Sequence, residues 1–428
     1  MKRIINPAKE QWSKLTQRPT ADFSAIEPVV DEVFTAVQSQ GDDAVAAYSL
    51  KFDKIAPKAL IVDEELLATA KAELPKELVE AIDVAYTNIY RFHNAQKTPT
   101  VRVSTQEGVD CWQTKKPIEK VGIYIPGGTA PLFSTVLMLA IPAQIAGCKQ
   151  IVLCTPPSGD GVPAAIRYAA YKCGITLVAQ IGGIQAIAAL TFGTTTIPKV
   201  YKIFGPGNQY VTVAKQKATQ YQTAIDMPAG PSELLVVADN SANPSYVAAD
   251  LLSQAEHGKD SQVILVTTSN DFGDLVEAEI KRQLVELPRK DIATAALENS
   301  LVIYFDDDAN ALAFINEYGP EHYIVCATNE SLFVDGVSNA GSVFIGNYTP
   351  ESAGDYASGT NHTLPTNGYT KQYSGVNLDA FLKAITYQRI SAEGIQQLGP
   401  HIEAMAQAEG LYAHKNAVTL RLNDLNNG

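Results

Sequence analysis

Positive charge is scarce in this sequence. The 428 residues contain 33 lysines and arginines against 46 aspartates and glutamates, which gives a formal net charge of -13. An acidic surface repels nucleic-acid phosphates and has no electrostatic attraction to anionic lipids. We therefore expect no nucleic acid and no membrane among the partners of this chain.

Cysteine is also scarce, since the chain has five and contains no C-x-x-C pair. An odd number without paired spacing is not typical of a disulfide framework, and most of these cysteines lie in apolar runs such as 151-IVLCTP. The first residues, 1-MKRIINPAKEQW, contain no apolar core of a secretory signal. These features predict reduced, buried cysteines and a cytoplasmic location.

The sequence lacks both common nucleotide fingerprints, G-x-G-x-x-G after a strand and G-x-x-x-x-G-K-[ST]. Three other glycine-rich stretches follow predicted strands instead, namely 126-PGGTAP, 182-GGIQA and 205-GPGNQY. Glycine lets a backbone approach a ligand closely, and open α/β sheets bind ligands at the carboxyl ends of their strands. We favour a ligand-binding edge over ordinary turns, which remain the alternative for each stretch alone.

One segment, Val121 to Cys148, has no charged residue and is long enough to cross a bilayer. It contains Pro126, Gly127, Gly128, Pro131 and Pro142. A strand, a glycine-rich loop and a buried helix therefore explain the segment better than a membrane-spanning helix.

Short β-branched runs alternate with helix-like segments through the middle of the chain. The predicted strands are 121-VGIYI, 150-QIVLC, 176-TLVAQI and 200-VYKIF, then 234-LLVVAD, 262-QVILVTT, 301-LVIYFDD and 323-YIVCAT. This alternation is typical of parallel sheets with helical crossovers. We predict an α/β fold of two Rossmann-like modules with small helical extensions at both ends.

The predicted organisation is discontinuous. Residues 1–20 form an N-terminal extension, 21–123 and 234–375 a first α/β domain, 124–233 a second α/β domain, and 376–428 a C-terminal helical tail.

Two Glu-His pairs draw attention because the chain has only six histidines. In 251-LLSQAEHG, Gln254 and His257 are three residues apart near a helix end, so they share a face and could bind a metal. A histidine that interacts with the helix dipole is the alternative. In 318-YGPEHY, a loop between a helix and a strand, Glu321 and His322 could flank a substrate as an acid–base pair. A polar entry to the strand is equally consistent with that pattern.

Two further features concern the remaining histidines. His93 and His401 fit surface or capping positions better than a site. The long stretch 350-PESAGDYASGTNHTLPTNG has little hydrophobic patterning and contains Asp355 and His362, which favours a functional loop.

Together these stretches resemble the histidinol dehydrogenase family. The resemblance runs from about Lys120 to His414 and is carried by 124-YIPGGTAPLFSTVLM, 182-GGIQAIAAL, 205-GPGNQYV, 226-DMPAGPSE, 250-DLLSQAEHG, 319-GPEHY, 353-AGDYASGTNHTLPT and 409-EGLYAHKNAV. It implies an enzyme that uses zinc and NAD to oxidise L-histidinol through an aldehyde to L-histidine, the final step of histidine biosynthesis. It also implies a homodimer whose C-terminal tails reach the partner's site.

The resemblance further implies a role for each matching residue. The implied zinc ligands are Gln254, His257, Asp355 and His414. The implied substrate contacts are Ser232, His362 and Glu409, together with the zinc ligands and His322. The implied NAD contacts are Tyr124, Gln185 and Asn208. Glu321 would activate water, and His322 would be the general base.

Three other functions fit parts of the pattern. A related zinc- and NAD-dependent dehydrogenase could act on another small polar alcohol. A zinc hydrolase would use the same residue types without a nicotinamide. A non-catalytic α/β binding module would bind neither zinc nor NAD.

Overall fold

The computed structural model describes residues 1–19, 25–55, 59–127, 131–228 and 230–427. Its contacts divide the chain into two compact units. The first consists of Met1–Gln96 and Ile118–Phe381, and the second of Lys97–Pro117 and Leu382–Gly428. The expected boundary at residues 20 and 21 lies outside the described residues.

The first unit contains a six-stranded parallel sheet. Its order is β1 (Lys2–Ile5), β11 (Leu301–Tyr304), β10 (Gln262–Thr267), β9 (Glu233–Ala238), β12 (His322–Cys326) and β13 (Ser342–Ile345). Alternate residues of β9 enter different clusters: Leu234 and Val236 pack into one, and Leu235 and Val237 into the other. Both faces of the sheet are therefore buried, as its continuous apolar strands predict.

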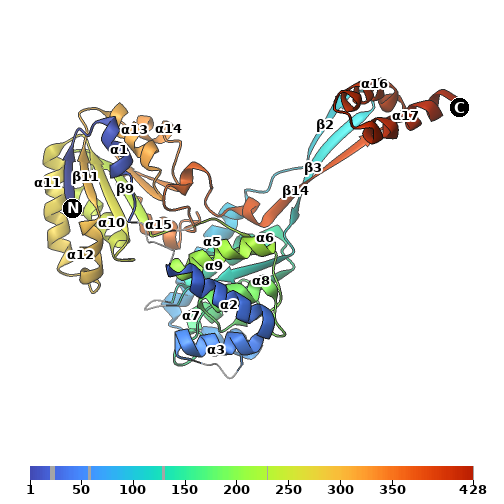
Figure 1. Ribbon diagram of the computed structural model, residues 1–428. Helices are drawn as coiled ribbons and strands as arrows, with labels where there is room; N and C mark the ends of the chain where they lie inside the picture. Colours follow the sequence, from blue (N-terminus) through green and yellow to red (C-terminus); the bar gives the residue numbers. More distant parts are fainter. Residues whose placement is uncertain (20–24, 56–58, 128–130, 229, 428) are drawn as a thin grey trace. The chain divides into compact units, whose positions relative to one another are not determined.

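Helices cover both faces of this sheet (Figure 1). Residues of α10 (Pro244–Ala255), α11 (Asn270–Leu284) and α12 (Lys290–Glu298) pack into the first cluster. Residues of α1 (Lys9–Leu15), α13 (Asp308–Tyr318) and α14 (Glu330–Asp335) pack into the second. The N-terminal extension thus supplies an edge strand as well as a helix.

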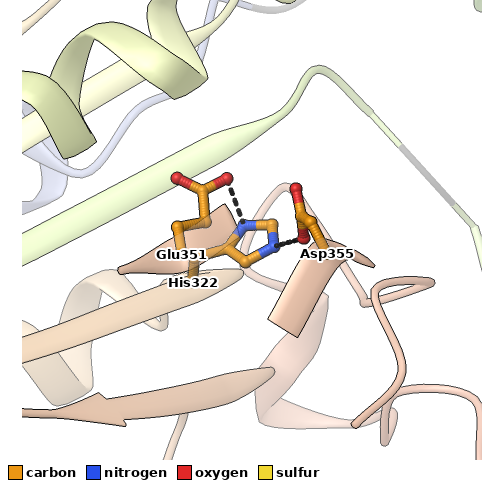
Figure 2. Close-up of side chains that lie close together, drawn as sticks. All are labelled: His322, Glu351 and Asp355. Atoms are coloured by element: carbon orange, nitrogen blue, oxygen red, sulfur yellow. Dashed lines mark ion pairs between the residues drawn. The ribbon is translucent and has the colours of Figure 1, made fainter. Parts of the chain in front are cut away.

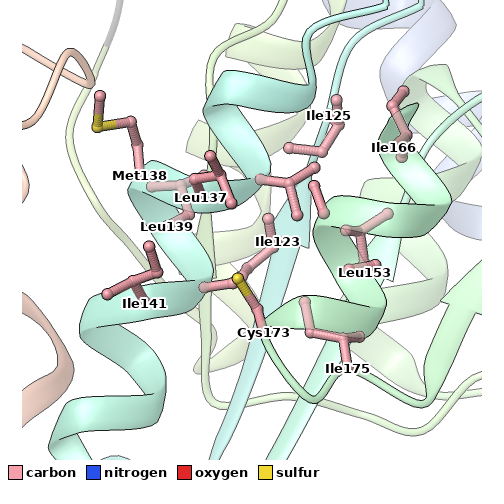
Figure 3. Close-up of a cluster of buried hydrophobic side chains, with 14 of the residues drawn as sticks. Ile123, Ile125, Leu137, Met138, Leu139, Ile141, Leu153, Ile166, Cys173 and Ile175 are labelled. Atoms are coloured by element: carbon pink, nitrogen blue, oxygen red, sulfur yellow. The ribbon is translucent and has the colours of Figure 1, made fainter. Parts of the chain in front are cut away.

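A second parallel sheet in this unit has five strands. Its order is β6 (Leu177–Ala179), β5 (Gln150–Cys154), β4 (Lys120–Tyr124), β7 (Lys202–Phe204) and β8 (Ala224–Ile225). Figure 3 shows part of its core, where Ile123 and Leu153 of the sheet meet Leu137 and Ile166 of the covering helices. Those helices are α6 (Phe133–Ala146), α7 (Ala164–Lys172), α8 (Gly183–Phe192) and α9 (Gln209–Ala218). The prediction of two parallel α/β modules is confirmed.

The N-terminal helices pack against this five-stranded sheet. Residues of α4 (Glu64–Thr69) and α5 (Lys76–Asn94) join the cluster on one face, and residues of α2 (Glu27–Gln40) and α3 (Asp42–Asp53) join the other. The sequence analysis grouped residues 21–123 with 234–375 instead. The difference arises because the apolar faces of α2 and α5 carry no information about which sheet they cover.

The second unit is built on an antiparallel sheet that the sequence analysis did not predict. The order is β14 (Leu382–Ile390), β3 (Val109–Pro117) and β2 (Val101–Gln106), and helices α16 (Ala392–Ala408) and α17 (Tyr412–Asn427) follow. The predicted C-terminal helices are confirmed, but a strand precedes them, and residues 376–381 of the predicted tail belong to the first unit. These strands were missed because most of their residues are exposed or half-buried, which gives no continuous apolar run.

The uncharged segment Val121–Cys148 contains most of β4 and all of α6, as expected for a strand followed by a buried helix. Among the described residues, no helix is both long and apolar enough to cross a membrane. The five cysteines are free, and Cys154, Cys173 and Cys326 are buried.

Candidate active site

The two Glu-His stretches meet at the amino ends of β9 and β12. Glu321 and His322 stand at the start of β12, where His322 lies opposite Leu234 of β9. Helix α10 follows β9, begins at the Asn243 cap and ends at Ala255, so its last turn returns to the same edge. Glu321 and His322 do not point apart, as an extended loop would require, because Glu321 Oε2 lies 3.6 Å from His322 Nδ1.

The imidazole of His322 is fixed on its Nδ1 side. Gln254 Nε2 lies 3.0 Å from that nitrogen and also donates to the carbonyl oxygen of Glu233 at 3.2 Å. The same Nδ1 lies 3.1 Å from the carbonyl oxygen of Glu233, and in the neutral ring that donates to this oxygen, Nε2 carries no proton and faces Asp355 Oδ1 at 3.5 Å (Figure 2). The last turn of α10 therefore sets the orientation of the histidine on β12.

Three polar atoms at this place are buried without a hydrogen-bond partner among the described residues. They are Gln254 Oε1, His322 Nε2 and Asp355 Oδ1. An unpaired buried polar atom costs about 1–3 kcal/mol. Because three such atoms are gathered in one cluster, the site is suited to a further ligand that they would hold in common.

Glu351 is a site residue that the sequence analysis missed. Its side chain is buried, and Oε1 lies 3.9 Å from His322 Nδ1. His322, Glu351 and Asp355 each offer a metal-ligating atom, and these atoms lie within 4.8 Å of one another. The expected loop is helical here, since α15 spans Glu351–Tyr356. The spacing of four between Glu351 and Asp355, on one helical face, was the available signal.

Burial and crowding of carboxylates shift the proton affinities of the cluster. Burial raises the pKa of Glu321 to about 8 and that of Glu351 to about 8. Burial opposes the charged form of His322, but Glu321 and Glu351 outweigh it and raise the pKa of the imidazole. Burial lowers the pKa of His257. Burial thus favours the protonated carboxyls, whereas their ionised forms favour a protonated imidazole, so these three groups compete for protons.

A cleft of about 610 Å³ opens onto this cluster. Its lining includes eight of the predicted site residues, which are Asn208, Ser232, Gln254, His257, Glu321, His322, Asp355 and His362. His362 is held from both sides, since its Nδ1 lies 2.8 Å from the carbonyl oxygen of Asp355 and its Nε2 lies 3.0 Å from Thr135 Oγ1. Residues of both parallel-sheet modules therefore contribute to one cleft.

A second cavity, of about 940 Å³, lies at the carboxyl end of the five-stranded sheet. Tyr124 and Asn208 line it, and the Tyr124 hydroxyl accepts a hydrogen bond of 3.0 Å from the Gly183 amide. Gln185 is fully buried and donates to Asp53, whose carboxylate lines the cavity. The expected glycine-rich edge exists, although residues 128–130 of 126-PGGTAP and residue 229 of 226-DMPAGPSE lie outside the described residues.

The two cavities share part of their lining. Pro126, Gly127, Asn208 and Tyr210 border both of them. The larger cavity therefore lies next to the cleft that contains Glu321 and His322.

Two predicted site residues belong to the second unit. Glu409 follows α16 and His414 lies in α17, and both side chains are exposed. The cleft described above is formed by the first unit without them.

Comparison with known proteins places this geometry in a family. A family model described as histidinol dehydrogenase matches residues 16–422. A histidinol dehydrogenase of Bacteroides thetaiotaomicron is 55% identical over 426 residues, which cover 99% of this chain and 100% of the relative. The chain belongs to the histidinol dehydrogenase family.

Solved structures agree with this membership. The crystal structure of histidinol dehydrogenase from Elizabethkingia anophelis has a TM-score of 0.97 at 53% identity, over 100% of this chain and 99% of that one. An acetylating aldehyde dehydrogenase from Geobacillus thermoglucosidasius has a TM-score of 0.51 at 15% identity, over 89% of this chain and 94% of that one. The second match shows a similar fold alone.

Proposed function

We propose that this histidinol dehydrogenase family member oxidises L-histidinol to L-histidine, the final step of histidine biosynthesis, with the reduction of two NAD⁺. The observation that carries the proposal is the cluster of unpaired buried atoms, Gln254 Oε1 and Asp355 Oδ1, beside Glu321 and His322. This reaction needs a polar cluster that can bind a metal and an acid–base pair. It also needs a cavity large enough for a dinucleotide, next to the cleft that contains that pair.

The donor set fits zinc. Gln254 and Asp355 offer oxygen and His257 offers nitrogen, all on the lining of one cleft, and mixed imidazole and oxygen ligands suit zinc better than magnesium. His414 is proposed as the fourth ligand. When bound, the metal would hold and orient the imidazole and amino nitrogens of the substrate. His322 is the exception in the polar cluster, because the proposal keeps its Nε2 for proton transfer.

The larger cavity fits NAD. It borders Tyr124 and Asn208, and Gln185 lies directly behind its wall, where it supports Asp53. Bound there, NAD would supply the hydride acceptor for both oxidations. The residues that border both cavities would set the distance between that ring and the cleft.

The side chains of the cleft then divide the proton transfers. His322 takes the proton of the substrate hydroxyl in the first oxidation, which yields the aldehyde. Glu321 removes a proton from water as the oxygen adds to the aldehyde carbon, and His322 gives its proton to the aldehyde oxygen, which yields a hydrate and frees the imidazole to act again. His322 takes the hydrate's hydroxyl proton in the second oxidation, which yields the carboxylate. One alcohol and one water thus give one carboxylate and two NADH, with three protons released.

Ser232 and His362 are proposed to contact the substrate from the same cleft, together with Glu409. Glu409 and His414 reach it from a partner subunit in a proposed homodimer. The free cysteines fit a reducing compartment, so we place the enzyme in the cytoplasm.

The test is a coupled measurement of NADH formed and L-histidinol consumed by zinc-loaded enzyme. A ratio of two supports the four-electron reaction, whereas plain amino alcohols should react far more slowly. No NADH with L-histidinol would refute the proposal, and hydrolysis of an amide without NAD would point to the hydrolase alternative.

A further inference from the structure

A buried ion pair lies directly beneath the proposed acid–base residues. Arg18 donates from Nε to Glu233 Oε1 at 3.0 Å and from Nη2 to Oε2 at 2.8 Å. The side chain of Arg18 is 6% exposed and that of Glu233 is 1% exposed, so neither charge is solvated by bulk water. Removing either partner of such a pair destabilises the fold, because the charge of the other partner stays buried and uncompensated.

Arg18 also holds the segment that leads into β12. Its Nη2 donates to the carbonyl oxygens of Tyr318 at 2.7 Å and Gly319 at 3.2 Å, and the guanidinium lies 3.6 Å from the Tyr318 ring centroid. Gly319 has a positive φ of 63°, so the chain turns sharply there before Glu321. The planar guanidinium supplies these contacts together, which an ammonium group cannot do.

Glu233 in turn holds both proposed catalytic side chains through its backbone. Its N–H donates to Glu321 Oε2 at 2.8 Å, and its carbonyl oxygen lies 3.1 Å from His322 Nδ1. Its carboxylate also accepts a bond from the Asn367 amide, in the segment that follows His362. One residue therefore connects Arg18, the acid–base pair and the wall of the cleft.

We infer that Arg18 and Glu233 are positioning residues, which fix the distance between Glu321 and His322 for the two oxidations. This inference rests on the proposed function. The N-terminal segment, whose other contacts attach it to the far edge of the sheet, thereby acts on the chemistry of the cleft. Neither side chain lines the cleft, so the effect passes through the backbone of residues 233 and 319.

The experiment compares Arg18→Lys and Glu233→Gln with the parent enzyme, each loaded with zinc and measured well below its melting temperature. Arg3→Lys is the matched control, because Arg3 anchors the same N-terminal segment to Asp274 and to the Asn270 carbonyl. We expect kcat to fall by at least about tenfold in Arg18→Lys, since small misplacements of reacting groups have effects of that order. The KM values for L-histidinol and NAD should stay within about threefold.

Measurements of zinc content and of folding distinguish a loss of positioning from a loss of stability. Both variants should retain the parent zinc content and circular dichroism while kcat falls, and Arg3→Lys should keep the parent kcat. A change in kcat smaller than tenfold in both variants, or a loss of zinc that accounts for the loss of rate, would overturn the inference. An inactive parent enzyme would instead refute the proposed function, so the two failures are distinguishable.

Discussion

The carboxylate of Glu321 accepts a hydrogen bond of 2.8 Å from the backbone N–H of Glu233, across the boundary between β12 and β9. The carbonyl of the same residue lies 3.1 Å from the ring of His322. The side chains of Glu321 and His322 are thus both held by the backbone of one residue, Glu233, in the neighbouring strand β9. This arrangement fixes their separation without using the atoms that a substrate needs.

Replacing His322 with asparagine should remove the proposed base and keep the local structure. An asparagine amide can donate to the Glu233 carbonyl in place of Nδ1, but it cannot take up a proton at neutral pH. We expect hydride transfer in single-turnover NADH measurements to fall by roughly 100-fold or more. Zinc content should remain near that of the parent.

The exposed His401 provides the control, and His401→Asn should have no effect on the rate. An unchanged rate in His322→Asn would remove this residue from the mechanism.

The strands of the two parallel sheets were predictable because each is a short β-branched run with both faces buried. The antiparallel strands of the second unit were not, since a pattern such as 101-VRVSTQ contains no residue that is buried in the fold. The N-terminal helices were predicted as helices, but their packing partner was not. An apolar helical face indicates that the helix packs against something, but it does not indicate which sheet it packs against.

The site divides in the same way. Spacing alone paired Gln254 with His257, and both line the cleft. The meeting of 251-LLSQAEHG and 318-YGPEHY depends on the pairing of β9 with β12, which no local pattern contains. The resemblance to a family supplied the roles of Glu321 and His322. It did not indicate Glu351, whose importance rests on burial beside His322.

Glu321→Gln should separate the two oxidations. Glutamine can still accept the Glu233 N–H bond, so the cleft should keep its shape, but it cannot remove a proton from water. The first oxidation should continue while hydration slows, by roughly 100-fold. With a carbonyl-trapping reagent present, the ratio of NADH to L-histidinol should move from two toward one.

Glu317→Gln is a suitable control for that experiment, because Glu317 is exposed on α13 and forms an ion pair with the surface residue Lys371. A ratio that stays at two in Glu321→Gln would show that another group activates the water.

His257→Ala and Asp355→Ala should each lower zinc content strongly, because each removes one donor from a set of four. Glu256→Gln, a change beside His257, should keep zinc at the parent level. Metal analysis of dialysed protein checks both. Full zinc in His257→Ala would contradict the ligand assignment.

The same ligands allow a test of subunit sharing. His257→Ala and His414→Ala chains should each be inactive alone. Verified heterodimers of the two should regain up to about half of the activity of the parent dimer, since one of their two composite sites is then intact. Heterodimers without any activity would exclude a shared site.

Tyr124→Phe should weaken binding of the dinucleotide. The change removes the acceptor of the Gly183 amide, which leaves that amide unpaired at the wall of the larger cavity. We expect the dissociation constant for NADH to rise by about three- to thirtyfold, which corresponds to one lost hydrogen bond. Fluorescence titration without substrate measures it, and Tyr201→Phe, on an exposed ring, should leave it unchanged.

The expectation of a surface or capping position was wrong for His93, whose ring is fully buried and bonded through Nδ1 to the Ile89 carbonyl at 2.8 Å. Burial lowers the pKa of this imidazole from 6.5, and the bond to Ile89 opposes that effect only in part. The unfolded chain therefore binds more protons than the folded chain just below pH 6.5. The contribution of His93 to stability is complete above that pH and is lost as the pH falls through its folded-state pKa.

His93→Gln should therefore make stability less dependent on pH on the acid side. The parent should lose more stability than the variant between pH 7.5 and pH 5.5, by on the order of 1 kcal/mol. Melting temperatures at the two pH values measure this difference, and carboxylates that titrate in both proteins cancel from the comparison. His401→Gln should behave as the parent, because that ring is exposed in α16. Equal pH dependence in His93→Gln and the parent would mean that the buried ring gains its proton without cost to the fold.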